Sequence, residues 1–324
     1  MNKINPLISI VIPTFNQSEM LDFLFNQHIK LFKKYNISVI VSDNASTDDT
    51  AIVVCKWQKE SSLISYYRNS KNIGFDKNVM VALSYSGATY AWLMGDTYYI
   101  SESLIKAVTF KLSNNDVDVC IINLENMLKG IKSKIYENQS ELLSDLGGIM
   151  TCLSCLIFHK RVTHSNGFDQ WVDSLFMHMG MVLHYINNKN FKVAWIADQS
   201  IESLKHPTLN KRNWSHGKNV LDIGFKAWVK FVFSLPESYT LQSKKDCIKS
   251  FGKLSKLATL RGFFLMRLRG QIAFDSYKKY EYEINLSSTL PKFIIVSILI
   301  IPKWMIRAAC KFVAVILGKK GVCY

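Results

Sequence analysis

Strands and helices alternate through the first hundred residues, and this alternation limits the possible folds more than any other feature of the chain. Continuous apolar runs at residues 7–12, 37–42, 63–67 and 90–94 predict strands that are buried on both faces. Helical spacing of apolar residues predicts helices at 17–35 and 76–86, and a capping box at residues 46–49 predicts a helix that continues to residue 60. We therefore expect an α/β fold, a mostly parallel sheet with helices on both faces.

Polar residues follow each of these four strands at the point where it ends. They are Thr14 and Asn16, Asp43 and Asn44, Asn72 and Gly74, and Asp96. Any one of them has an ordinary explanation, because Asn, Asp and Gly are common in turns. Four successive strand ends point instead to one crevice, since open parallel sheets bind ligands at the carboxyl ends of their strands. The chain has no G-x-G-x-x-G after its first strand and no G-x-x-x-x-G-K-[ST] loop, which disfavours a dinucleotide-binding domain and a P-loop enzyme.

The pattern changes beyond residue 96. Strands are expected at 117–124 and 191–197 and a helix at 175–187, whereas basic helical stretches dominate from about residue 214. Residues 1–200 hold 18 Lys and Arg against 18 Asp and Glu, but residues 201–324 hold 22 against 7. We expect two domains: residues 1–205 with the sheet, and residues 206–324 as a basic, mostly helical region that seeks an anionic partner.

The basic region contains stretches suited to a membrane surface. Residues 254–274 mix arginines with aromatic and aliphatic side chains, as in an interfacial amphipathic helix, although packing of a helical subdomain explains them equally well. Residues 293–301 and 304–317 are largely apolar, and neither is long enough to span a bilayer. We expect this region to bind an anionic membrane surface. We expect no nucleic acid as a partner, because the chain lacks a recognisable nucleic-acid-binding motif.

The cysteines and the N-terminal sequence both favour the cytoplasm. Seven cysteines are an odd number and do not form a disulfide framework, which fits a reducing compartment. The apolar run at residues 7–13 has no basic n-region and no small-residue cleavage site, so it does not predict a signal peptide. Cys152 and Cys155 form a C-x-x-C without a second ligand pair, and we expect a buried strand there rather than a zinc site.

Three of the motifs at the strand ends are specific in combination. They are Ser9-Ile10-Val11-Ile12-Pro13-Thr14-Phe15-Asn16, Val41-Ser42-Asp43-Asn44-Ala45-Ser46-Thr47-Asp48, and Asn72-Ile73-Gly74-Phe75. Over about residues 5–200 the chain resembles the GT-A fold of family 2 glycosyltransferases. The segments 92–96 and 168–185 are most similar to the abequosyltransferase-like bacterial enzymes, which build O-antigen or capsular glycans. The resemblance implies an inverting glycosyltransferase that moves a sugar from a nucleotide-sugar donor to a lipid-linked oligosaccharide. Together with the basic region, it leads us to expect a peripheral enzyme at the cytoplasmic face of the membrane.

The resemblance assigns the nucleotide to the strand-end residues. It implies a pocket lined by Pro13, Thr14, Asn16, Asp43, Asn44, Asn72, Gly74 and Asn78. In this reading the Asp43 carboxylate accepts hydrogen bonds from the base or the ribose. Gly74 allows close approach of the backbone to the nucleotide.

Asp96 stands where the family carries an acidic metal-binding motif, which usually has two or three carboxylates. Here the run Gly95-Asp96-Thr97-Tyr98-Tyr99 has only one. One carboxylate together with diphosphate oxygens and water can hold Mg²⁺. We therefore expect Mg²⁺ or Mn²⁺ at Asp96, with Lys or Arg cations that offset the charge of the leaving group as the alternative.

An inverting transfer needs a base that deprotonates the acceptor hydroxyl. Many relatives carry an acidic pair on a later helix, and here that stretch offers His178 and Asp173 instead. We expect His178 to be the base, although it also suits a helix core and Asp173 suits a helix N-cap. The reduced acidic motif leaves a catalytically silent nucleotide- or glycan-binding subunit as an alternative. A sugar nucleotidyltransferase is less supported, because no basic Gly-rich loop follows the first strand.

Overall fold

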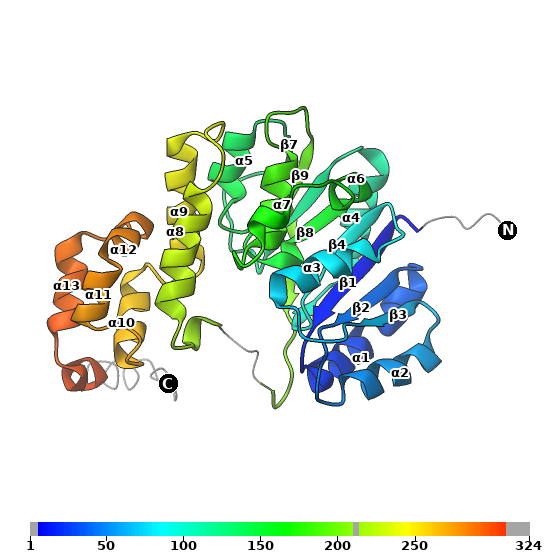
Figure 1. Cartoon of the computed structure of the whole chain (residues 1–324), viewed down its shortest axis with the longest axis horizontal. Coiled ribbons are helices and arrows are strands. Elements are labelled where there is room, and N and C mark those ends of the chain that lie inside the picture. The colour runs from blue at the N-terminus through cyan, green and yellow to red at the C-terminus, as the bar shows by residue number, and fades with distance from the viewer. Residues whose placement is uncertain (1–5, 210–213, 309–324) are drawn as a thin grey trace. The chain divides into compact units, whose positions relative to one another are not determined.

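The computed structural model describes residues 6–209 and 214–308, which form two compact units (Figure 1). Unit 1 holds the described residues up to 142, residues 149–209 and residues 236–239. Unit 2 holds residues 143–148, 214–235 and 240–308. Because the positions of the two units relative to one another are not determined, each is described by itself.

Unit 1 is built on a nine-stranded sheet with the order β3-β2-β1-β4-β8-β6-β9-β5, and β7 pairs with β9. The strands are β1 (Ile8–Thr14), β2 (Ser38–Asp43), β3 (Ile64–Arg68), β4 (Tyr90–Leu93), β5 (Tyr98–Tyr99), β6 (Val119–Leu124), β7 (Lys134–Tyr136), β8 (Leu156–His159) and β9 (Val193–Ser203). The first four run parallel, as the sequence predicted. Ile10, Val11 and Ile12 of β1 are inaccessible to solvent, as expected for a strand covered on both faces.

Strand β8 makes the sheet mixed rather than wholly parallel. It lies between β4 and β6 and is antiparallel to both. The expectation of a buried strand at Cys152 and Cys155 was wrong: Leu153–Cys155 form a short 3-10 turn, and the strand begins only after it. β6 nevertheless runs parallel to β9, and two antiparallel steps through β8 make it parallel to β4. The carboxyl end of β6 therefore lies at the same edge of the sheet as those of β1 to β4.

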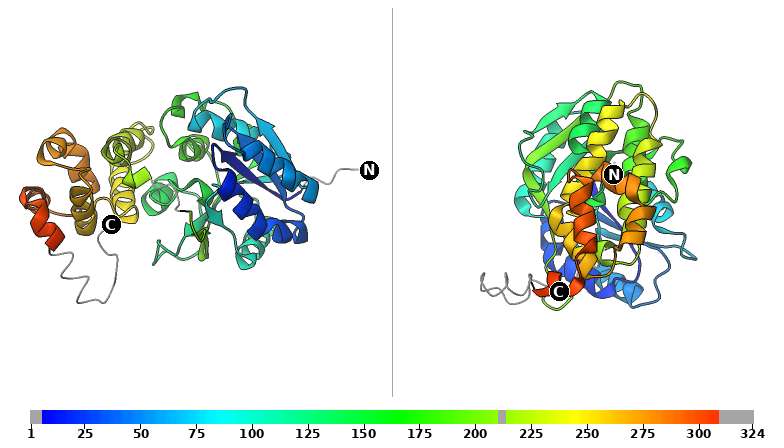
Figure 2. Two further views of the ribbon diagram at one scale, coloured as in Figure 1. Left: turned by 90° about the horizontal axis from the view of Figure 1, so that it is seen from below. Right: turned by 90° about the vertical axis from the view of Figure 1, so that its left-hand side faces the viewer.

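The helices of unit 1 cover both faces of this sheet (Figure 2). They are α1 (Ser18–Lys34), α2 (Thr50–Glu60), α3 (Phe75–Ser84), α4 (Glu102–Asn114), α5 (Gln139–Leu146), whose last residues belong to unit 2, α6 (Lys160–Thr163) and α7 (Met177–Tyr185). Right-handed crossovers place α1 and α2 on one face, because β1, β2 and β3 follow one another outward. The chain then returns from β3 to β4 through α3, which lies on the opposite face beside α7.

The predicted capping box is not formed. Helix α2 begins at Thr50 after Asp49, which makes no side-chain cap. Ser46 is buried and accepts a hydrogen bond from the Asn16 amide (2.9 Å). Asp48 instead accepts from the Thr50 amide (3.1 Å). Ser46 of the expected capping box therefore links the turn after β2 to the turn after β1.

Unit 2 is helical, and its described residues contain no strand. A π-helical turn (Asp222–Ala227) leads into α8 (Trp228–Phe233), followed by α9 (Leu241–Leu254), α10 (Leu260–Leu268), α11 (Phe274–Lys279), α12 (Glu281–Ser287) and α13 (Lys292–Ile300). The stretch 254–274 is not one helix, because α9 ends at Leu254 and α10 begins at Leu260. Phe263 and Met266 of α10 lie in the core of the unit with Tyr277 and Ile295. Packing of a helical subdomain therefore explains this stretch.

In the part of the chain that the structure describes, no single helix has the length and apolarity needed to cross a membrane. Helices α12 and α13 reach that length and composition only as a pair bent by 120°. Of the apolar stretch predicted at residues 304–317, residues 309–317 lie outside the described residues.

Candidate active site

The carboxyl ends of four parallel strands meet at one edge of the sheet, in the order β4, β1, β2, β3. Thr14 at the end of β1 lies opposite Asp43 at the end of β2, which in turn lies opposite Arg68 at the end of β3. Across the other neighbour, Thr14 Oγ1 donates a hydrogen bond to Asp96 Oδ2 (3.1 Å). The structure thus brings the predicted residues of the first, second and fourth strand ends together.

The turns that follow β1 and β2 are locked to each other. The amide of Asn44 donates to the Thr14 carbonyl (2.9 Å). Asn16 has the left-handed φ of 52°, and its Oδ1 accepts from the Thr47 amide (2.7 Å). Pro13, which has no amide to donate, sits between them on β1 opposite Ser42. These hydrogen bonds join the two turns at the point where the resemblance places the nucleotide.

Asp43 is fully buried and held by the protein's own donors. Its carboxylate accepts from the Ser46 amide (2.8 Å), from Tyr66 Oη (2.6 Å) and from Arg68 Nη1 (2.9 Å). Burial, together with the bond to this carboxylate, raises the pKa of Tyr66 to about 12. The Arg68 side chain is 42% exposed, so it carries the outward-facing charge of this group.

Sequence reasoning missed Arg68 and Tyr66, although a signal existed. Both lie at the end of the third predicted strand, and Arg68 is the register partner of Asp43. A charged residue at a strand end beside an acidic one is a candidate ion pair at the binding edge.

The 69–74 loop is held by side-chain amides. Asn44 Nδ2 donates to Asn72 Oδ1 (2.9 Å) and to the Gly74 carbonyl (3.2 Å), while its Oδ1 accepts from the Ile73 amide (2.9 Å). Asn78 is buried, and its Oδ1 accepts from Ser42 Oγ (2.9 Å). Asn44 and Asn78 therefore point into the protein, whereas Asn72 and Gly74 are exposed at the edge. Gly74 has a φ of 85°, which a residue with a side chain rarely adopts.

Asp96 is carried by a turn that Ser154 fixes. Ser154 Oγ accepts from the Gly95 amide (2.9 Å), and the Ser154 carbonyl accepts from Trp92 Nε1 (3.0 Å). This is the structural role of the C-x-x-C segment, which sequence reasoning did not identify. Among the described residues no group of three or more His, Cys, Asp or Glu side chains is arranged to hold a metal ion. The partly exposed Asp96 carboxylate suits the mode in which Mg²⁺ or Mn²⁺ is shared between one carboxylate and substrate phosphates.

The loop before α7 is strained and lies beside the start of α3. Asp173 and Leu175 have left-handed φ angles of 64° and 69°, a conformation unusual for residues other than Gly and costly for Leu. The Leu175 amide donates to Oδ2 of Asp76, a buried residue in the first turn of α3 (2.9 Å). Asp76 Oδ1 has no hydrogen-bond partner among the described residues. Burial raises the pKa of Asp76, although the amides of this loop counteract the shift.

His178 and Asp173 are placed very differently. His178 is 2% exposed, and its Nε2 donates to the Thr151 carbonyl (3.0 Å). Burial lowers the pKa of His178 to about 4, so the ring is neutral at pH 7. It lies behind Phe75, whose ring meets it edge-on at 6.3 Å. Asp173 is exposed to solvent on the strained loop.

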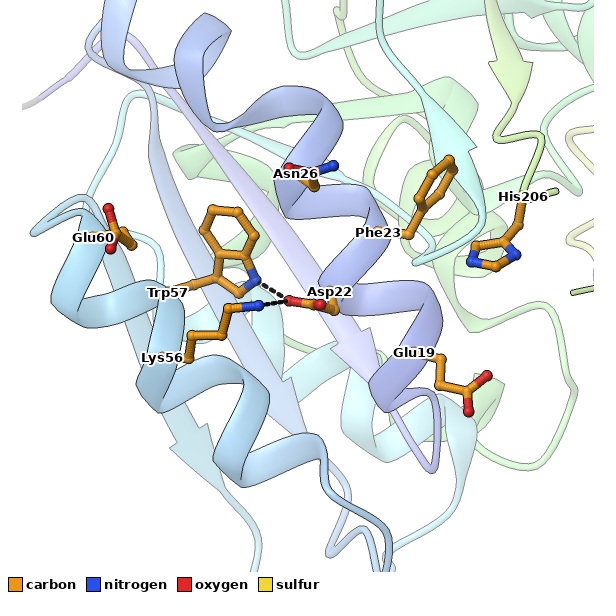
Figure 3. A pocket seen from close by; sticks show the side chains of 8 residues that line it. All are labelled: Glu19, Asp22, Phe23, Asn26, Lys56, Trp57, Glu60 and His206. Carbon is orange, nitrogen blue, oxygen red and sulfur yellow. Dashed lines mark hydrogen bonds and ion pairs between the residues drawn. The ribbon is translucent and has the colours of Figure 1, made fainter. Parts of the chain in front are cut away.

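A separate pocket of about 750 Å³ lies between α1 and α2 (Figure 3). Its lining includes Asp22, Trp57 and His206, and none of the residues predicted for the nucleotide lines it. Lys56 Nζ pairs with Asp22 Oδ1 (2.8 Å), and the His206 ring packs against Phe23. These contacts are those of helix packing. We therefore assign the site to the strand edge and not to this pocket.

The fold and the strand-edge site define an α/β domain of the GT-A type. Residues 9–148 match the family described as Glycosyl transferase family 2. The match agrees with the resemblance predicted from the motifs for this part of the chain.

Relatives and solved structures agree with this assignment. The chain is 29% identical over 215 residues to an abequosyltransferase of Salmonella typhimurium, covering 56% of this chain and 64% of the relative. It is 27% identical over 146 residues to the GalNAc(5)-diNAcBac-PP-undecaprenol beta-1,3-glucosyltransferase of Campylobacter jejuni, covering 42% of this chain and 46% of the relative. The matches thus span less than two thirds of the length of either relative. A mannosyltransferase of Pyrobaculum calidifontis, solved with GDP-Man and Mn²⁺, has the same fold, with a TM-score of 0.56 at 11% identity over 98% of this chain and 89% of that one.

Proposed function

We propose that this chain is an inverting glycosyltransferase of bacterial surface polysaccharide synthesis, which moves a sugar from a nucleotide-sugar donor to a lipid-linked oligosaccharide. The observation that carries the proposal is the set of contacts that runs along the strand edge from Asp96 through Thr14 to Asp43. It lies inside the part of the chain that matches the family. The relative named for an undecaprenol-linked acceptor supports the acceptor class, and the abequosyltransferase supports glycosyl transfer.

The donor nucleotide is proposed to lie over the turns after β1, β2 and β3. Asn16, Asn72 and Gly74 face outward or lie partly exposed there, and they supply the direct contacts. Asp43, Asn44 and Asn78 are engaged inside the protein, and we assign them to holding the outer residues in place. Arg68 adds a cation at the same edge, where it can meet an anionic donor.

Asp96 is proposed to hold a divalent cation, Mg²⁺ or Mn²⁺. Such an ion neutralises charge on the diphosphate leaving group. Asp96 is oriented for this by Thr14, which donates to its Oδ2, and by the turn that Ser154 anchors. The Mn²⁺ in the mannosyltransferase complex belongs to a protein of the same fold.

Asp173 is proposed as the general base in preference to His178. An inverting displacement requires a proton acceptor for the attacking hydroxyl, on the side opposite the departing nucleotide. The carboxylate of Asp173 is exposed and lies on a loop tied to the first turn of α3, next to Gly74 and Phe75. The ring of His178 is enclosed and its Nε2 is occupied by Thr151. We assign His178 to fixing the start of α7.

The test separates donor binding from turnover. Thermal unfolding is measured with UDP, CDP, GDP or dTDP, each with and without Mn²⁺. A nucleotide at about 100 times its dissociation constant adds about 2.7 kcal/mol to the free energy of unfolding. Asp43→Ala is expected to abolish this shift, and Asp96→Asn to abolish its dependence on Mn²⁺. Asp275→Asn, an exposed acidic residue of unit 2, is the matched control and leaves both unchanged.

Turnover is then measured as release of the nucleoside diphosphate in the presence of a lipid-linked acceptor. Asp173→Asn is expected to lower the rate by about 10²–10⁴-fold while the nucleotide shift is kept. Nucleotide binding without turnover in the wild type would instead identify a silent binding subunit. Release of pyrophosphate from a nucleoside triphosphate would identify a nucleotidyltransferase.

A further inference from the structure

Two large apolar side chains, Phe293 and Ile300, are exposed on the outer face of α13 (Lys292–Ile300), with the exposed Ser297 between them. Phe293 is 69% exposed and Ile300 68%. Beyond the break at Ile301 and Pro302, the helical residues 303–308 add Trp304, which is 70% exposed. The inner face of the same helix, with Ile295, Ile298 and Leu299, is packed in the core of unit 2. The unit therefore buries one face of α13 and still presents another, and exposed apolar patches of this kind mark interaction surfaces.

Exposed cations accompany these apolar side chains. Lys303 and Arg307 are exposed on either side of Trp304. Lys292, at the other end of α13, is paired with Glu281. Over residues 240–308 the sequence has thirteen Lys and Arg and four Asp and Glu. Exposed large apolar side chains, one of them a Trp, together with nearby cations have the composition of a surface that enters the headgroup region of an anionic bilayer.

We propose that the outer face of α13, with Trp304 and the cations Lys303 and Arg307, docks unit 2 onto an anionic phospholipid surface. The helix lies in the plane of the interface, because its nine residues are far fewer than the roughly 20 that a spanning helix needs. A second copy of the chain fits this face poorly, since two such surfaces would bring like charges together. The α10 stretch is not part of the surface, because Phe263 and Met266 are buried.

This inference deepens the proposed function. It rests on that function only in explaining why docking to a membrane would help the enzyme. A lipid-linked acceptor is confined to the membrane, and a docked enzyme meets it by diffusion in two dimensions. Docking itself is measured without donor or acceptor. Failure of glycosyl transfer and failure of docking are therefore distinguishable.

The experiment is sedimentation of the full chain with vesicles of phosphatidylcholine alone, or of equimolar phosphatidylcholine and phosphatidylglycerol. We expect binding to the anionic vesicles. The triple variant Phe293→Ser, Ile300→Ser, Trp304→Ser is expected to lower the partition coefficient by at least about tenfold, because each substitution removes apolar area that would leave water. Lys303→Gln with Arg307→Gln is expected to reduce the preference for anionic over neutral vesicles.

Matched controls come from unit 1. Phe110 on α4 and Ile52 on α2 are 70% and 69% exposed, and their double Ser variant should bind vesicles like the wild type. Lys30→Gln with Lys59→Gln is the matched charge control, since both lysines are exposed on unit 1 helices. Equal vesicle binding by the triple variant and the wild type would overturn the proposal. So would a concentration-dependent dimer, seen by sedimentation velocity, that the triple variant loses, because a second copy would then be the occupant.

Discussion

The role of Asp76 is evident from the structure, whereas nothing in the sequence indicated it. It is a buried carboxylate whose one bonded oxygen holds a loop with two left-handed residues, Asp173 and Leu175. Strained backbone of this kind persists only where its surroundings fix it. Asp76 also lies two residues after Gly74, at the edge where we place the donor. We therefore regard it as a positioning residue that links the donor loop to the proposed base.

Replacement of Asp76 tests this link. Asp76→Ala removes the acceptor of the Leu175 amide and should release the loop, at a cost of about 1–3 kcal/mol in unfolding free energy. We expect a fall in kcat of at least about tenfold, with the nucleotide-induced thermal shift retained. Asp76→Asn keeps an oxygen that can accept the same hydrogen bond, so it should restore most of the activity. If Asp76→Asn is as inactive as Asp76→Ala, the charge of Asp76 matters and the positioning role is wrong.

At the scale of elements, two helices of unit 1 carry buried neutral histidines. His28 on α1 donates through Nδ1 to the Leu24 carbonyl (2.8 Å) and accepts at Nε2 from the Ile100 amide (3.0 Å). Burial lowers the pKa of His28 to about 4, as it does for His178 on α7. Both values lie below that of an unfolded histidine, about 6.5. The unfolded chain therefore binds more protons between these pH values, and stability falls as the pH falls through this window.

The expected size of this effect is about 1 kcal/mol per histidine between pH 7 and about pH 5.5. Urea unfolding followed by circular dichroism measures it as the slope of unfolding free energy against pH. The double variant His28→Gln, His178→Gln should have a smaller slope than the wild type, whatever its absolute stability. His164→Gln, an exposed histidine after α6, should keep it. A slope unchanged in the double variant would show that these two rings do not titrate on unfolding.

Among the elements of the fold, some could be predicted from the sequence and others could not. Strands β1 to β4 are continuous apolar runs separated by amphipathic helices, and such runs have few alternatives to a buried parallel strand. A buried strand was expected at Cys152 and Cys155, but β8 spans Leu156–His159, because a 3-10 turn occupies Leu153–Cys155 and a short apolar run does not fix where a strand begins. The strand-end residues were found because topology alone brings them together. The inward orientation of the Asn44 and Asn78 side chains could not be predicted, because it depends on hydrogen-bond partners far apart in the sequence.

The contacts of Arg68 and of Asp76 were not predicted, for a related reason. Arg68 and Asp43 are 25 residues apart and meet only through the register of β2 and β3. Asp76 and Leu175 are separated by 99 residues. Sequence periodicity reports the face on which a residue lies, but not the residue opposite it.

For the whole molecule, the uneven distribution of charge predicts that membrane binding and nucleotide binding depend differently on salt. Residues 1–200 balance 18 basic against 18 acidic side chains, whereas residues 201–324 carry the entire net charge of +15. Raising the salt concentration from about 0.1 M to about 1 M shortens the Debye length from about 10 Å to about 3 Å. Attraction between the basic region and an anionic bilayer should weaken accordingly, while the apolar contribution of Phe293, Ile300 and Trp304 persists.

We therefore expect the preference of the chain for anionic over neutral vesicles to disappear over this range of salt, with binding to neutral vesicles maintained. The nucleotide-induced thermal shift should change far less, because the donor edge lies in the neutral part of the chain and its central ion pair, Asp43 with Arg68, is partly buried. Vesicle sedimentation and thermal unfolding on the same samples measure both quantities. Parallel loss of both with salt would mean that the donor edge and the bilayer depend on the same charges, and the separation of roles between the sheet and the basic helices would be wrong.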